Sequence, residues 1–126
     1  MIDKIASVIL AIVGIINLIP AAVFFDPSKT ARFYGVPIAG TDLTILMRHR
    51  GVLLGLVGIA LIVAAIKTEY RLFAISLALI SKLTFIFLTF TATDHNAEIR
   101  QVALIDIGAI VMLLVVLGIH FYSRSI

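Results

Sequence analysis

Five polar side chains lie inside long apolar stretches of this sequence: Asn17, Arg48, Arg50, Lys82 and Asp106. An ionisable side chain in a segment that crosses a membrane costs about 2.5 to 3.5 kcal/mol, so it usually faces a bundle interior or a wet cavity. Arginine can hold a phosphate or a carboxylate through two parallel hydrogen bonds. These residues therefore point to an anion-binding site or to structural ion pairs.

The composition shows what must position these side chains. Of the 126 residues, 62% are hydrophobic and 13% are charged, and the mean hydropathy is +1.20. An ordinary soluble domain is about half apolar and about a quarter charged, and a disordered chain has low hydrophobicity. We therefore expect an integral membrane protein.

Further classes are excluded by the cysteine count and the distribution of charge. The absence of cysteine removes disulfides, a thiolate nucleophile, Cys-bound zinc and iron-sulfur clusters. The net charge is +3, but the ten Lys and Arg residues form no dense patch, so we expect no nucleic-acid partner. We expect no metal and no cofactor, because the three histidines lie at different depths: His49, His95 and His120.

Four apolar stretches predict four transmembrane helices, since a bilayer core about 30 Å thick needs about 20 helical residues. The second run, residues 52–66, is too short alone, so we expect its helix to begin after Asp42 as N-cap and to include both arginines. Pro20 predicts a kink in the first span. The predicted fold is an all-α integral membrane four-helix bundle, a single transmembrane domain over residues 1–126 with spans at about 5–25, 43–66, 72–91 and 99–121.

The segment between the first two spans predicts a short interfacial helix. Asp26 is typical of a helix start and Gly35 of a helix stop. We expect Phe33 and Tyr34 to rest at headgroup depth, with Arg32 facing water or lipid phosphate.

Counting residues from the helix ends places the polar side chains near one depth. Arg50 and Asp106 each lie about 10 Å below the same surface at 1.5 Å per residue, Asn17 about 12 Å and Lys82 about 13 Å. With Arg48 they are expected to form one shared polar site. Because the Cβ atoms of Arg50 and Asp106 tilt toward the same surface, we favour these two as the ion pair.

A stripe of small residues lies on the second span: Gly51, Gly55 and Gly58. Such a stripe lets another helix approach closely. Through it we expect either a second copy of the chain, giving a homo-oligomer, or a partner membrane protein.

The balance of charge favours a ligand. If both arginines and Lys82 face the site with only Asp106 opposing them, the surplus is about +2, which is too costly to leave buried and uncompensated. We expect a polar pocket that binds or moves a lipid or an amphiphilic anion. The alternative is a structural or accessory subunit whose charges only fix helix packing. A membrane-embedded enzyme ranks third, since no catalytic motif occurs and no catalytic residue is assigned.

One resemblance covers nearly the whole chain. It rests on the string LMRHRGVLLGLVG at residues 46–58, preceded by Phe33-Tyr34-Gly35 and followed by Ile105-Asp106. The chain resembles a family of small uncharacterised bacterial four-helix membrane proteins, often labelled phosphopantetheine adenylyltransferase by automated naming, and it is loosely similar to DoxX-like proteins. Enzymes of that name are soluble α/β proteins with an H-x-G-H-type motif, which this sequence lacks. The resemblance thus implies the fold and carries over no catalytic residue.

The resemblance implies a multi-pass protein of the bacterial inner (cytoplasmic) membrane. Four spans put both termini on one side, and cations are enriched on the cytoplasmic side of short loops. The terminal side has four: Lys4, Lys67, Arg71 and Arg124. The other side has three: Lys29, Arg32 and Arg100. This count favours cytoplasmic termini, whereas counting Arg48 and Arg50 as loop residues reverses it.

Overall fold

The computed structural model describes residues 1–37 and 39–125, in which all regular structure is helical. The first span is α1 (Ile2–Leu18), the 3-10 turn η1 (Ile19–Ala21) and α2 (Ala22–Phe25). The short α3 (Lys29–Tyr34) follows, then α4 (Gly40–Ile66), the 3-10 turn η2 (Thr68–Tyr70), α5 (Arg71–Thr91) and α6 (Ala97–Ser125). Four segments, residues 2–25, 40–66, 68–91 and 97–125, are long and apolar enough to cross a membrane. The chain is an all-α, small multi-pass membrane protein.

The helices run further than the apolar stretches that predict them. The second span begins at Gly40 rather than at Leu43, and α6 extends to Ser125. Polar residues at the helix ends continue the backbone hydrogen bonding, which hydropathy does not report. At Pro20, where a kink is expected, the helix tightens into the 3-10 turn η1, and proline has no N–H to donate there.

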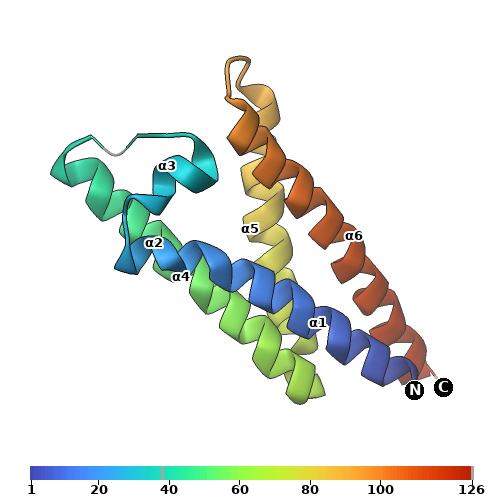
Figure 1. Ribbon diagram of the computed structural model, residues 1–126. Coiled ribbons are helices and arrows are strands. Elements are labelled where there is room, and N and C mark those ends of the chain that lie inside the picture. The colour runs from blue at the N-terminus through green and yellow to red at the C-terminus, as the bar shows by residue number, and fades with distance from the viewer. Residues whose placement is uncertain (38, 126) are drawn as a thin grey trace.

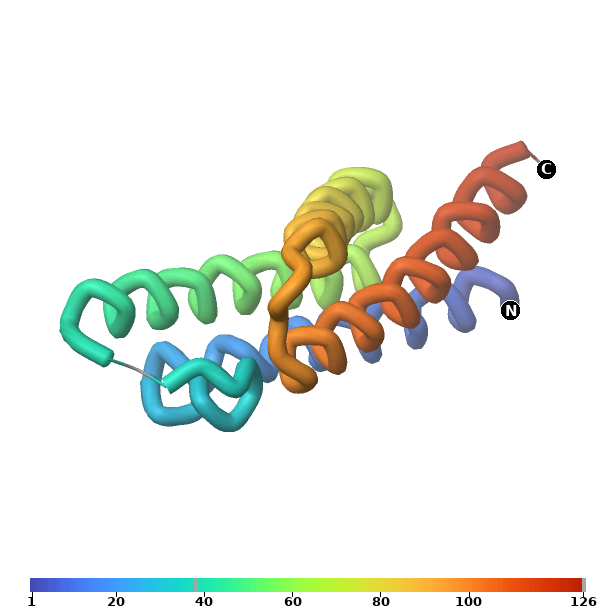
Figure 2. Tube along the Cα trace, turned by 90° about the horizontal axis from the view of Figure 1, so that it is seen from above, coloured from blue at the N-terminus to red at the C-terminus, as the bar shows by residue number. Residues whose placement is uncertain are grey.

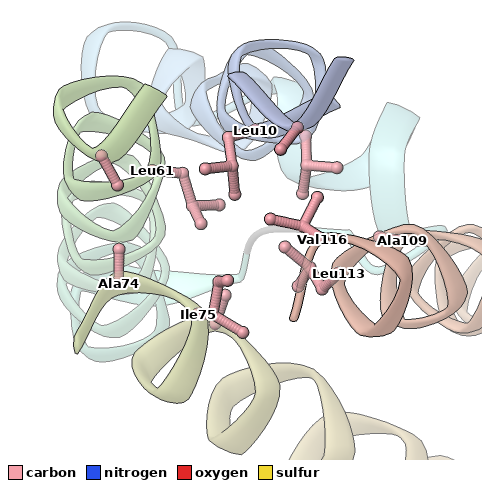
Figure 3. Packing of buried hydrophobic residues seen from close by; sticks show 11 residues of the cluster. Leu10, Leu61, Ala74, Ile75, Ala109, Leu113 and Val116 are labelled. Atoms are coloured by element: carbon pink, nitrogen blue, oxygen red, sulfur yellow. The ribbon is translucent and has the colours of Figure 1, made fainter. Parts of the chain in front are cut away.

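The spans converge at the end that carries both termini. In Figure 1, α6 approaches α1 there and diverges from it toward the opposite end, where α3 lies. Figure 2, seen from above, shows α1 and α4 running alongside each other, with α5 seen nearly end-on. The buried apolar cluster fills the convergent half (Figure 3), with members from all four spans, among them Leu10, Leu61, Ile75, Leu113 and Val116.

The glycine stripe of α4 is occupied by the chain's own first span. A Cβ atom on Gly58 would lie 2.7 Å from the carbonyl oxygen of Gly14, and one on Gly51 would lie 2.7 Å from that of Pro20. A Cβ on Gly55 would lie 3.1 Å from the Cβ of Ala21. Backbone therefore packs on backbone along this seam, and a partner helix or a second copy would have to use another face.

A buried arginine ties the chain together near the termini. Arg71 is 1% exposed and donates from Nη1 to the Asp3 carboxylate at 3.0 Å and from Nη2 to the Asp3 carbonyl oxygen at 3.2 Å. The Ser123 hydroxyl donates to the same carboxylate at 3.4 Å, so both termini lie at one end, as expected. Treating Arg71 as a loop cation was wrong, because η2 turns the chain so that Arg71 begins α5 against α1.

Candidate functional site

A cavity of about 310 Å³ lies in the half of the bundle where the spans diverge, away from the termini. Four of the five polar residues singled out in the sequence line it, one from each span: Asn17, Arg50, Lys82 and Asp106. Much of the remaining wall is apolar, including Ile16, Ile19, Leu54, Phe85, Val102 and Ile105. Counting depth along the helices therefore predicted which side chains come together.

Three of these side chains form a hydrogen-bonded chain across the bundle. The Lys82 ammonium donates to the Asp106 carboxylate at 3.0 Å and to the Asn17 side-chain oxygen at 2.7 Å. Asn17 in turn donates from Nδ2 to the carbonyl oxygen of Leu54 at 2.7 Å. The Lys82 and Asp106 side chains are only 6% and 15% exposed. The network thus joins α1, α4, α5 and α6 through one buried ion pair.

The expected Arg50–Asp106 ion pair is wrong, since the Asp106 carboxylate pairs with Lys82 instead. The prediction relied on Cβ direction, but a lysine has a flexible four-carbon stem that lets its ammonium reach away from its Cβ direction. Arg50 instead lies over two aromatic rings, with its Cζ atom 5.3 Å from the Tyr34 centroid and 5.1 Å from the Phe85 centroid. Such contacts stabilise a cation by its attraction to the ring face. Within residues 1–37 and 39–125, Arg50 has no hydrogen-bonding or ion-pair partner.

Arg48 lies outside this cavity. Its Nε donates to the Phe24 carbonyl oxygen at 2.8 Å, and its Cζ lies 4.6 Å from the Phe24 ring centroid. With His49 it lines a separate hollow at the start of α4. Two residues along a helix correspond to a rotation of about 200°, so Arg48 and Arg50 point to nearly opposite sides.

The short helix α3 supplies residues that the expected site lacked. Arg32, Phe33 and Tyr34 all line the cavity, and Arg32 is also exposed on the surface. Tyr34 is 5% exposed, so its side chain packs inside the protein, while its expected depth at the headgroups stays a prediction. No spacing in the sequence shows that α3 folds back over the bundle, because that placement depends on contacts with α6.

The C-terminal end of α3 is held by side-chain hydrogen bonds. Asn96 donates to the carbonyl oxygens of Tyr34 at 2.8 Å and Gly35 at 3.3 Å, and it accepts from the Ile99 N–H at 2.7 Å as the cap of α6. Before the helix, the Ser28 hydroxyl donates to the Asp26 carboxylate, and this hydrogen bond holds the pKa of the Asp26 carboxyl below its ordinary value. Asn96 therefore ties the end of this cover to the start of α6.

Gly35→Ala is expected to loosen this cover. Gly35 adopts φ +66°, which strains an alanine, and a Cβ atom there would lie 2.9 Å from the Asn96 Nδ2 atom that donates to the Tyr34 and Gly35 carbonyl oxygens, so the added methyl group disturbs these hydrogen bonds. Hydrogen exchange measured by mass spectrometry should rise across residues 29–34. Gly40→Ala is the matched control, since Gly40 also has positive φ (+86°) but, among the residues that the structure describes, nothing lies within 4 Å of an added Cβ atom. Equal increases in both variants would mean that backbone strain, not contact with α6, controls the exchange.

The cavity carries a surplus of positive charge. Three cations line it, Arg32, Arg50 and Lys82, against the single carboxylate of Asp106, which leaves a net charge of +2. The Lys82 and Asp106 charges offset each other at 3.0 Å, so the surplus resides on the two arginines. Such a surplus attracts an anion.

The described ranges also contain metal-ligating and hydroxyl side chains. They contain no group of three or more His, Asp or Glu side chains able to hold a metal ion. The hydroxyls of Ser76 and Thr84 donate back to carbonyl oxygens of their own helix, as is usual in apolar helices.

No family model, curated protein or solved structure matches the chain.

Proposed function

We propose that the cavity binds the anionic head of a lipid or of another amphiphile. The observation that carries the proposal is that two cations without a paired carboxylate, the half-buried Arg50 and the surface-exposed Arg32, line a small cavity with largely apolar walls. A charge in such surroundings is costly unless it is paired, and arginine pairs well with phosphate and carboxylate groups. An anion with an apolar tail matches both the charge and the walls.

Arg50 is the proposed primary contact. Its guanidinium is held over the Tyr34 and Phe85 rings, while within the described part of the chain its N–H groups have no acceptor. A guanidinium that is already oriented loses less side-chain freedom when it binds a planar or tetrahedral anion. Lys82, by contrast, is committed to Asp106 and Asn17, and so it helps to position the walls.

The walls connect the cavity with the outer apolar surface. Ile19 and Ile105 line the cavity, and yet they are 53% and 48% exposed on the molecule as a whole. A volume of about 310 Å³ is at the low end of the roughly 300 to 1,000 Å³ usual for ligand pockets. We propose that the head and the adjoining part of the tail occupy the cavity, while the rest of the tail extends past these isoleucines into lipid.

A structural or accessory role is the second candidate, and one observation favours it. The Lys82, Asp106 and Asn17 network links all four spans, which would fix their packing without any ligand. The bacterial cytoplasmic membrane and the family of small bacterial four-helix proteins remain part of the proposal, since they rest on the resemblance.

Arg50→Gln tests the binding role. Charge-assisted hydrogen bonds contribute about 1.5 to 3 kcal/mol, so the variant should retain roughly tenfold less anionic lipid or more. Native mass spectrometry of the detergent-purified protein, followed by lipid extraction, measures the retained lipid. Arg48→Gln is the matched control, because Arg48 is two residues away on the same helix and outside the cavity. Equal retention by the wild type and both variants would contradict the binding role and favour the structural one.

A further inference from the structure

The size of the charge surplus indicates how many negative charges the bound anion carries. Resting on the proposed function, we infer that the cavity is built for a phosphomonoester, which carries about two negative charges at neutral pH, in preference to a phosphodiester or a carboxylate, which carry one. The relevant quantity is the number of charges left over after the protein has paired its own.

That number is two, one charge each on Arg32 and Arg50. Arginine stays protonated throughout the physiological range. Lys82 lies 3.0 Å from Asp106, and their opposite charges offset each other. Asn17, the polar contribution of the first span, is neutral. The charged and titratable groups that line the cavity are therefore Arg32 and Tyr34 from α3, Arg50 from α4, Lys82 from α5 and Asp106 from α6.

The two surplus charges come from different elements. Arg50 is on α4, and Arg32 is on the covering helix α3, so the cavity receives a cation from two of its sides, the Arg32 side chain being exposed at the surface as well. Among residues 1–37 and 39–125, neither guanidinium has a hydrogen-bond acceptor. A singly charged head would leave one arginine without a counter-charge, whereas a doubly charged head would offset both.

The neutral polar groups of the wall fit the same ligand. A phosphomonoester presents three terminal oxygens that are strong acceptors. Besides the arginines, Ser81 and Gln101 line the cavity and carry a hydroxyl and an amide N–H₂ group able to donate. A carboxylate has only two oxygens, and two of the four oxygens of a diester are blocked by ester bonds.

The test compares lipids that differ in head charge. Purified protein in phosphatidylcholine nanodiscs is titrated with phosphatidic acid, with phosphatidylglycerol or with oleate, and binding is measured by native mass spectrometry. At pH 7.5 we expect phosphatidic acid to bind at least tenfold more tightly than the other two. The second pKa of a phosphomonoester is about 6, so its charge falls toward one as the pH falls. The preference over phosphatidylglycerol should therefore shrink toward parity at pH 5, and the phosphatidylglycerol arm reports any titration of the protein itself.

A pair of variants tests whether Arg32 causes the preference for phosphatidic acid. Arg32→Gln removes one surplus charge and should bring the affinity for phosphatidic acid down to that for phosphatidylglycerol, with little change in the latter. Lys29→Gln removes a charge from the same helix, but Lys29 is not in the cavity wall, so the preference should persist. Competition by inorganic phosphate would identify a site that reads the phosphate alone, and its absence would identify the lipid as the source.

The outcomes separate the two proposals. Equal binding of phosphatidic acid and phosphatidylglycerol at pH 7.5, with both lost in Arg50→Gln, would overturn the phosphomonoester inference and leave the anion-binding function standing. No binding of any of the anionic lipids above the phosphatidylcholine background would overturn both.

Discussion

Lys82→Met is expected to destabilise the bundle by about 3 to 5 kcal/mol, because it leaves a buried carboxylate without its partner. The Asp106 side chain is 15% exposed, and Lys82 is its hydrogen-bonding partner among the described residues. The same substitution also removes the donor to Asn17. The free energy of unfolding can be measured in mixed micelles with increasing denaturing detergent.

A double variant separates the cost of leaving the Asp106 charge unpaired from the cost of losing the other contacts of Lys82. Lys82→Met with Asp106→Leu removes both charges and should recover most of the stability, since well-packed apolar side chains often replace a buried ion pair at little cost. Wild-type stability in Lys82→Met alone would contradict the importance of the pair. Unlike Arg50→Gln, which should reduce lipid retention with the fold intact, this change acts on the fold first.

Gly58→Val is expected to cost about 3 kcal/mol, the upper end of the usual range for overpacking. An added Cβ would lie 2.7 Å from the Gly14 carbonyl oxygen and 3.2 Å from the backbone nitrogen of Leu18. Backbone atoms of a packed helix cannot turn aside as a side chain can, so α1 and α4 must separate along the seam.

The matched control is Gly118→Val in α6, where nothing lies within 4 Å of an added Cβ. It introduces the same β-branched side chain into a helix, and its effect should stay within about 0.5 kcal/mol, as for a surface substitution. The same unfolding measurement applies to both variants. Similar losses at the two positions would show that β-branching, and not the close approach of α1 and α4, causes the effect.

The spans and the depth of their polar residues could be predicted, because both follow from one-dimensional counting. A helix rises by a fixed distance per residue, so Asn17, Arg50, Lys82 and Asp106 could be placed at one level. Helix ends were less accurate, as at Gly40, because hydrogen bonding continues beyond the apolar run.

The partners within the site could not be predicted, because they depend on side-chain reach and on contacts between distant segments. The predicted ion pair of Arg50 with Asp106 was wrong, because the long side chain of Lys82 reaches the Asp106 carboxylate. The place of Arg32 depends on α3 folding back, which Asn96 secures from 62 residues beyond Tyr34. The burial of Arg71 depends on Asp3, 68 residues away.

The double use of Asn96 makes the cover and the start of α6 parts of one mechanical unit. One end of its amide holds the last carbonyl groups of α3, and the other end caps the first turn of α6. Lifting α3 therefore disturbs the loop between α5 and α6, and displacement of that loop is transmitted to α3.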